Sequence, residues 1–242
     1  MREQGGVSDG VMSPGPTAER PRVAMILAAG RGERMRPLTD RLPKPLLPVR
    51  GKPLIEHHLE RLARAGIDRI VINLAWLGGM IRDALGNGSR FGVRIDYSEE
   101  APQALETGGG IFRALPLLGE GAFLVVNGDV FSDYPFAEAR LALERDGHLV
   151  LVPNPPQHPT GDFGLERGLA VPEAGVRFTF SGIAVYRRAL FAKCADGAFP
   201  LKPVLIRAMA AGRCSAEIYR GSWHDVGSID RLGALSGAGG AP

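Results

Sequence analysis

The sequence predicts an α/β protein with a mixed, mainly parallel sheet flanked by helices. Short runs of consecutive apolar residues, such as VAMILA at residues 23–28, alternate with stretches of helical periodicity. Such runs are typical of strands that are buried on both faces. Strands that alternate with helices of this length indicate parallel βαβ units with right-handed crossovers.

The first half of the chain follows this alternation closely. Pro53 suits the first turn of a helix and Gly66 its end, and the alternating pattern of residues 93–98 suits a strand near an edge of the sheet. The predicted strands are residues 23–28, 69–74, 93–98, 122–129 and 148–154, and the predicted helices are residues 53–66, 77–85, 110–118 and 136–147.

The regular alternation of predicted strands and helices ends after about residue 155. Residues 178–191 and 214–226 have the composition of sheet, whereas residues 201–212 and 228–235 have that of helices. We expect a single domain over residues 21–236, made of a first part (about 21–155) and an added substrate-binding part (156–236). Residues 1–20 are rich in Gly, Pro and small polar side chains, so they are predicted to be a disordered extension. Residues 237–242 are a short tail.

Composition limits the class of protein. The chain has 242 residues, of which 45% are hydrophobic and 23% charged, as in ordinary globular proteins. No apolar run approaches the ~20 residues of a membrane span, and residues 1–20 lack the apolar centre of a signal peptide. Cys194 and Cys214 are too few for a disulfide framework. We expect a cytoplasmic protein with reduced thiols and no membrane partner.

Positive charge gathers between residues 30 and 52. Seven Arg and Lys residues face only Glu33 and Asp40 there, a local excess of five charges in a chain whose net charge is +3. Such a cluster suits a polyanion. The segment contains no aromatic residue, which disfavours nucleic acid and favours a small phosphorylated ligand.

The segment LAAGRGERMRPLTDRLPKPLLPV, residues 27–49, leaves the first predicted strand at its carboxyl end, where ligands bind in open parallel sheets. Small residues there leave backbone N–H groups accessible to a phosphate, and Arg31, Arg34 and Arg36 can neutralise it. Lys44 lies between two prolines, which stiffen the backbone around it. The segment fits neither a Walker A loop nor G-x-G-x-x-G, since Met35 takes the third glycine position.

This segment resembles the signature of the sugar-phosphate nucleotidyltransferases, which runs G-x-G-x-R-x-x-P-L-T and then P-K-P. Three further motifs follow in the order of the family: ETGGGI at 106–111, VVNGD at 125–129 and WHDVGS at 223–228. The resemblance covers about residues 23–235 and implies a Rossmann-like nucleotidyltransferase fold. The short length, with LETGGGIF, GDF and FTFSGI, is most similar to the branch that uridylylates N-acetylmuramic acid α-1-phosphate in cell-wall recycling.

The resemblance implies roles for particular residues. Arg34, Lys44 and Asp129 would be catalytic, and Asp129 and Asp225 would hold Mg²⁺, which usually takes one or two carboxylates plus phosphate oxygens. Sugar contacts would come from Asn127, Asp162, Ser181 and Gly182. Nucleotide contacts would come from Leu27, Ala28, Ala29, Gly30, Arg31, Gly32, Lys44, Gly108, Gly109 and Asn127.

Structural alternatives stay open for several of these residues. Asp129 and Asp162 suit turns, and Asp225 precedes Ser228, a candidate helix N-cap. The glycines of ETGGGI suit a flexible loop as well as a nucleotide-contacting one, and Gly182 suits a β-bulge.

One element of larger relatives is missing. Glucose-1-phosphate thymidylyltransferases carry a Glu-Lys-Pro element that contacts the sugar phosphate, and no such tripeptide occurs here. Arg220 and Arg177 are alternative cations for that role.

The function that follows is transfer of UMP from UTP to a sugar 1-phosphate, with release of pyrophosphate, by a monomer or small homo-oligomer. Mannose-1-phosphate guanylyltransferase and glucose-1-phosphate thymidylyltransferase are alternatives within the family. A nucleotide-sensing subunit without catalysis is an alternative of another class.

Overall fold

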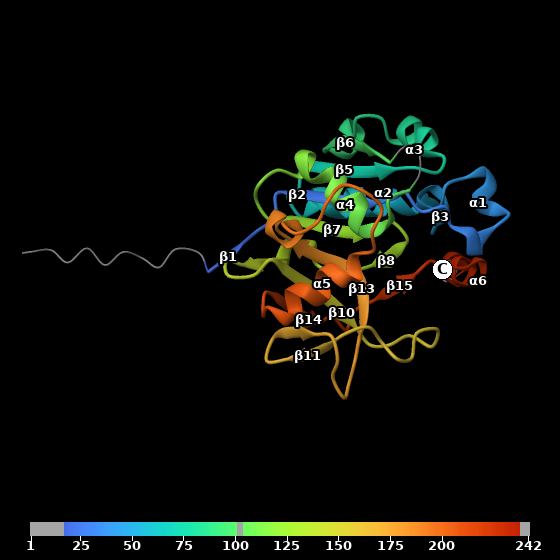
Figure 1. The fold of residues 1–242 in the computed structure, drawn as a ribbon. Helices are drawn as coiled ribbons and strands as arrows, with labels where there is room; N and C mark the ends of the chain where they lie inside the picture. Colours follow the sequence, from blue (N-terminus) through green and yellow to red (C-terminus); the bar gives the residue numbers. More distant parts are fainter. Residues whose placement is uncertain (1–16, 101–103, 238–242) are drawn as a thin grey trace, which may run out of the picture.

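A computed structural model of the protein describes residues 17–100 and 104–237, and Figure 1 shows its arrangement. It confirms the α/β class: a mixed sheet of nine strands has the order β11-β12-β14-β10-β13-β7-β2-β5-β6. These strands are β2 (Val23–Leu27), β5 (Arg69–Leu74), β6 (Arg94–Glu99), β7 (Phe123–Asn127), β10 (Gly147–Val152), β11 (Gly164–Glu166), β12 (Leu169–Val171), β13 (Thr179–Tyr186) and β14 (Cys214–Ile218).

Three small ladders and six α-helices complete the described fold. The ladders pair β1 (Ala18–Glu19) with β9 (Leu141–Ala142), β3 (Pro48–Val49) with β4 (Lys52–Pro53), and β8 (Val130–Ser132) with β15 (Trp223–Asp225). The helices are α1 (Leu38–Arg41), α2 (Leu54–Arg64), α3 (Gly78–Leu85), α4 (Glu106–Leu118), α5 (Leu201–Ala210) and α6 (Ile229–Gly237).

Strand direction in the sheet explains where a site can form. Strands β7, β2, β5 and β6 are parallel neighbours, and β6 lies at the edge, as predicted. Strand β13 runs antiparallel between β7 and β10, while β10 and β14 are parallel. The sheet is therefore continuous through both predicted parts of the chain. The carboxyl ends of β2, β5, β6 and β7 meet at one edge.

Helices cover both faces of the sheet because each presents an apolar stripe to it. On one face, Ile55 and Leu59 of α2 and Ile81 of α3 pack with the strands in one cluster of buried residues. On the other face, Ile111 of α4 and Leu205 of α5 belong to a second cluster. The result is a three-layer α/β/α arrangement (Figure 1).

The last helix lies beside the basic segment near the start of the chain. Met35, Val49 and Leu54 form a third buried cluster with Val226 and Leu232, so α6 packs against residues that follow β2. Figure 1 shows α6 next to α1 at the same end of the molecule. Packing therefore brings residues from both ends of the described chain to one end of the sheet.

The predicted helix over residues 136–147 is wrong. The segment forms a single 3₁₀ turn, Phe136–Glu138, and then β9. Phe136, Ala139 and Leu141 are all buried in the cluster that includes α2, and their 3- and 2-residue spacing fits an irregular extended segment over that cluster. Helix propensity is a weak preference that such tertiary contacts override.

Part of the segment predicted to be disordered belongs to the fold. Ala18 and Glu19 pair with β9, and the Glu19 carboxylate accepts a hydrogen bond from the Ala122 N–H at 2.8 Å. Glu19 also pairs with Arg187 at 2.8 Å. Residues 1–16 and 238–242 of the predicted extension and tail lie outside the described residues.

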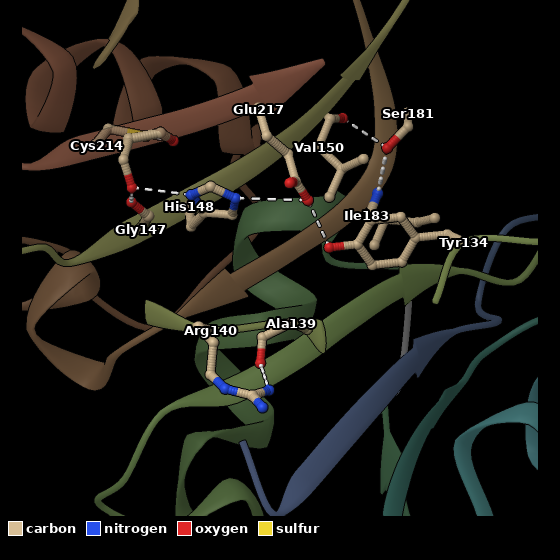
Figure 2. A network of polar contacts seen from close by, with 11 residues as sticks. Tyr134, Ala139, Arg140, Gly147, His148, Val150, Ser181, Ile183, Cys214 and Glu217 are labelled. Atoms are coloured by element: carbon tan, nitrogen blue, oxygen red, sulfur yellow. Dashed lines mark hydrogen bonds and ion pairs between the residues drawn. The ribbon is translucent and has the colours of Figure 1, made fainter. Parts of the chain in front are cut away.

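A polar network joins β10, β14 and the segment that follows β8 (Figure 2). The Tyr134 hydroxyl donates to Glu217 of β14 at 2.6 Å, and Nδ1 of His148 on β10 lies 2.9 Å from the Ser215 hydroxyl. The hydrogen bond with His148 is the main reason why the pKa of Glu217 is lowered from its usual value. These contacts stabilise the β10–β14 pair.

In the described residues, no helix is long and apolar enough to cross a bilayer.

Candidate active site

A cavity of about 470 Å³ opens at the carboxyl ends of β2, β5, β6 and β7. This is the edge at which open parallel sheets bind ligands. Nine predicted site residues line it: Leu27, Ala28, Ala29, Gly30, Gly32, Arg34, Lys44, Asn127 and Asp129. The structure thus brings the basic segment and the VVNGD motif to a common wall.

The loop after β2 holds its backbone against the cavity. The Ala28 N–H donates to Oδ1 of Asn73 on β5 at 2.8 Å. Gly32 has φ +70°, and a Cβ there would lie 2.9 Å from the Thr39 methyl group. The Thr39 hydroxyl donates to the Gly32 carbonyl at 2.9 Å. Glycine is required at position 32 because its backbone is left-handed and the Thr39 side chain leaves no room for a Cβ.

Lys44 reaches the cavity from a short 3₁₀ helix, Lys44–Leu46, that follows Pro43. Its side chain is only 11% exposed, and Nζ lies 2.5 Å from Oδ2 of Asp129, which follows β7. The Asp129 side chain is 32% exposed. A nearly buried ammonium paired with a more accessible carboxylate can contact a phosphate at the cavity wall without large side-chain rearrangement.

Asp129 and Asp225 are neighbours although they are far apart in the sequence. Strand β15 pairs with β8 so that Asp225 lies opposite Val130, and the Val226 N–H donates to the Asp129 carbonyl at 2.8 Å. Asp225 is half-buried and pairs with Nη1 of Arg231 at 2.9 Å. The β8–β15 ladder is therefore the element that brings the two aspartates together.

Two arginines converge at Gly227, which lines the cavity. A Cβ on Gly227 would collide with Nη2 of Arg231 and would lie 3.1 Å from Nη2 of Arg34. The Arg231 guanidinium thus pairs with Asp225, and that of Arg34 ends beside the same glycine. Sequence reasoning missed Arg231, although its position six residues after Asp225, in the first turns of a predicted helix, was a usable signal.

A buried polar pair forms another part of the wall. Nδ2 of Asn73 donates to Oε1 of Glu100 at 2.6 Å, and Oε2 of Glu100 accepts the Leu105 N–H at 2.7 Å. Both side chains are almost fully buried and both line the cavity. Gly110 makes room for Glu100, since a Cβ there would collide with Oε1. Both residues lie at or just after the ends of predicted strands, so the strand-end rule could have identified them.

The placement of Gly108 and Gly109 differs from the prediction. Helix α4 starts at Glu106, so the glycines lie inside the helix rather than in a loop before it. A Cβ on Gly108 would lie 2.6 Å from the Phe199 ring, and one on Gly109 would collide with the Gly197 carbonyl. Both glycines therefore allow the 197–199 segment to pack closely on α4. Of the ETGGGI motif, Glu106 and Thr107 line the cavity instead.

Arg31 also lies differently from the prediction. It is absent from the cavity wall in the described chain. Its guanidinium carbon lies 3.6 Å from the Trp76 ring centroid, and Nη2 pairs with Asp40 at 3.2 Å.

The predicted sugar-side residues do not form a common cluster around the cavity. Asn127 lines it, and Gly182 lies directly against the Asn127 side chain. Ser181 is buried: its hydroxyl donates to the Val150 carbonyl at 2.6 Å, and its carbonyl accepts the Trp223 N–H at 2.9 Å. Asp162 accepts the Phe180 N–H at 2.9 Å. The Ser181 and Asp162 side chains thus form hydrogen bonds to the backbone of neighbouring segments.

Of the two cations suggested for the sugar phosphate, Arg220 is exposed and Arg177 half-buried. Neither lies on the cavity wall among the described residues. Arg231, in contrast, contacts Asp225.

Asp129 and Asp225 are the predicted ligands of a magnesium ion, and their carboxylates pair with Lys44 and Arg231 here. In the described part of the chain, no group of three or more His, Cys, Asp or Glu residues is arranged to hold a metal. Asp129, which directly precedes β8, and Asp225 of β15 have neighbouring backbones, and one or two carboxylates are what Mg²⁺ takes when phosphate oxygens complete its coordination. Asp129 and Asp225 are therefore the residues that would hold it.

Fold and site together define an α/β protein with a cavity at the carboxyl edge of its sheet, lined in part by a cationic loop. Residues 23–167 match the nucleotidyl transferase family. The chain belongs to this family, as the resemblance in its signature segment predicts.

Two relatives extend the comparison. The chain is 52% identical over 232 residues to the N-acetylmuramate alpha-1-phosphate uridylyltransferase of Neisseria meningitidis serogroup B, covering 89% of this chain and 98% of that protein. It is 35% identical over 226 residues to the protein of the same name from Caulobacter vibrioides, covering 87% and 93%.

Solved structures agree on the fold. HddC from Yersinia pseudotuberculosis has a TM-score of 0.75 to this chain at 22% identity, covering 90% of this chain and 99% of that one. The chain therefore shares its architecture across nearly its whole length.

Proposed function

We propose that this chain transfers UMP from UTP to N-acetylmuramate α-1-phosphate, giving UDP-N-acetylmuramate and pyrophosphate. The observation that carries the proposal is the 52% identity to a uridylyltransferase over 98% of that relative's length. The cavity supports it, since its wall combines a cationic loop with Lys44 and Asp129. A role in cell-wall recycling and a cytoplasmic location are predictions that accompany this proposal.

The reaction is an in-line displacement at phosphorus. An oxygen of the sugar phosphate forms a bond to the α-phosphorus of UTP, and the bond from that phosphorus to the bridging oxygen of pyrophosphate breaks. The sugar phosphate is already ionised at neutral pH, so no general base is needed. The protein therefore contributes positioning and neutralisation of charge.

The side chains of the wall divide this task. Lys44, fixed beside Asp129, would contact the α-phosphate and the incoming phosphate. Arg34, beside Gly227, would stabilise the departing pyrophosphate. Backbone N–H groups of residues 29–32 would bind the nucleotide phosphates, and Asn127 would hold a ribose or sugar hydroxyl. Residues 156–236 would supply the remaining sugar contacts.

A magnesium ion is part of the proposal. Asp129 and Asp225 would hold it, and the bound ion would lower the repulsion between the two phosphates. Arg231 would keep the Asp225 carboxylate in place through the 2.9 Å ion pair.

The direct test is an assay of the purified full chain with pairs of nucleotide and sugar 1-phosphate. We expect the highest kcat/KM with UTP and N-acetylmuramate α-1-phosphate, measured as pyrophosphate release with the UDP-sugar identified by mass. A higher value for GTP with mannose 1-phosphate, or for dTTP with glucose 1-phosphate, would correct the substrate assignment. UTP binding without pyrophosphate release from any pair would indicate a nucleotide sensor.

Removal of the charged pair tests the mechanism. We expect Lys44→Ala and Asp129→Asn each to lower kcat about 10²- to 10³-fold, because each removes a group that acts on the charge of the transition state. The matched control is Lys52→Ala, which removes a lysine of the same basic segment that pairs with Glu60. That variant should keep near-normal turnover. Near-normal turnover of Lys44→Ala or Asp129→Asn at saturating substrates and Mg²⁺ would refute the corresponding role.

A further inference from the structure

Trp76 contacts the signature loop twice without lining the cavity. It follows β5, and its ring lies under Arg31, whose guanidinium carbon is 3.6 Å from the ring centroid. On its other side, Nε1–H of the indole donates to the Thr39 carbonyl at 2.9 Å. One side chain thus contacts the chain before and after residues 32–36.

These contacts form a closed circuit of side chains and backbone that begins and ends at Trp76. Arg31 pairs with Asp40 at 3.2 Å, and Asp40 directly follows Thr39, the residue that accepts the indole N–H. Asp40 also pairs with Arg36 at 3.0 Å. Trp76 follows β5, so these contacts connect both ends of the loop to the central sheet.

Apart from Trp76, the loop is held by the packing of Met35 in the third buried cluster and by the hydrogen bond from the Thr39 hydroxyl to the Gly32 carbonyl. Met35 is fully buried, but Arg34, Arg36 and Leu38 are exposed. Gly32 adds backbone freedom at φ +70°. Yet Gly32, Glu33 and Arg34 all contribute to the cavity wall. A loop that is cationic and mostly exposed needs an external contact if Arg34 is to be placed before substrate arrives.

We propose that Trp76 is a positioning residue that pre-organises this loop for the triphosphate of the nucleotide. The inference rests on the proposed function, since it concerns the same site. Arg31 then acts as part of the support of the loop rather than as a phosphate ligand. Without Trp76 the loop must be ordered at the moment of binding, so the loss falls first on nucleotide affinity.

Kinetics provide one test. We expect Trp76→Ala to raise KM for UTP about tenfold while KM for the sugar phosphate and the melting temperature change little. Trp76→Phe keeps a ring under Arg31 but loses the N–H donor, so its KM should be intermediate. The matched control is Tyr97→Ala, which removes a ring stacked 5.1 Å from Arg82 and a hydroxyl that donates to the Gly86 carbonyl, both away from the cavity wall. Its KM for UTP should match that of the native protein.

Limited trypsin digestion provides a readout that does not depend on turnover. Loop opening exposes the backbone after Arg31 and Arg34, so Trp76→Ala should be cut there at least several times faster, with UTP slowing the cleavage. Cleavage is mapped by mass spectrometry, and UTP affinity is measured by calorimetry. Unchanged affinity for UTP with unchanged cleavage would overturn the inference, as would lost stability without either effect. If the native protein releases no pyrophosphate, the proposed function fails, whereas affinity and cleavage still decide the role of Trp76.

Discussion

Gly182 shows how a residue without a side chain leaves room for one that lines the cavity. It lies in β13, where the pairing with β10 shifts register between Val150 and Leu151. The bulge gives Gly182 φ +77°, and a Cβ there would lie 2.6 Å from Nδ2 of Asn127. The structure thus supports the bulge interpretation of this glycine and also joins it to the cavity wall.

We expect Gly182→Ala to lower both stability and activity. The left-handed backbone costs an alanine about 1 kcal/mol, and displacement of Asn127 should lower kcat/KM at least tenfold. Gly212→Ala is the matched control, since Gly212 has φ +64° with open space around it. That variant should lose similar stability with unchanged kcat/KM. Equal activity of the two variants would show that Asn127 has no role in the reaction. Unfolding by urea and steady-state kinetics measure the two effects.

At the scale of elements, short strands matter more than their length suggests. Strand β1 has two residues and β8 and β15 have three each, too few for a periodic pattern. Yet β8 and β15 bring Asp129 beside Asp225, and β1 ties the start of the described chain to β9. Sequence periodicity identifies long elements such as α2 and β5 because each repeats an apolar spacing over at least six residues.

The contacts of β1 predict a measurable contribution to stability. Glu19→Ala leaves the Ala122 N–H and the Arg187 guanidinium without their carboxylate partner, so we expect a loss of about 1–3 kcal/mol in the free energy of unfolding. The control is Glu120→Ala, which removes an 85% exposed partner of Arg188 and should cost less than about 1 kcal/mol. Equal effects of the two substitutions in urea unfolding would contradict an integral role of β1.

At the scale of the whole molecule, a buried histidine links stability to pH. His58 of α2 is almost fully buried, and burial lowers its pKa to about 4. Hydrogen bonding to the Val130 backbone and the charge of Asp129 oppose this shift, while His57 and Arg61 add to it. The unfolded chain binds a proton near pH 6.5 that the folded chain rejects until about pH 4.

Stability should therefore fall as pH decreases from about 6.5 to about 4, by up to about 3 kcal/mol from this group. In His58→Leu this contribution should be absent, so the free energy of unfolding should depend less steeply on pH in that window. The control is His224→Leu, which removes an exposed histidine and leaves His58 in place. An unchanged slope in His58→Leu, measured by urea unfolding across the window, would contradict the burial argument.

Local pattern was sufficient for much of this protein. Apolar pattern predicted β2, α2, β5, α4, β7 and α5 to within a few residues at most boundaries, because the helices bury one repeating face and the strands are buried on both faces. Within the basic segment, glycine spacing and charge predicted the loop that forms the cavity wall.

Tertiary structure decided what depends on neighbours far along the chain. Whether Arg31 faces the cavity or Trp76, whether Gly108 meets a nucleotide or Phe199, and whether residues 136–147 coil or extend each depend on distant residues that no local window contains. The meeting of Asp129 with Asp225 is of the same kind, since it requires β8 to pair with β15. The sequence by itself determined the sheet edge and its cationic loop, and packing determined which side chains reach the cavity.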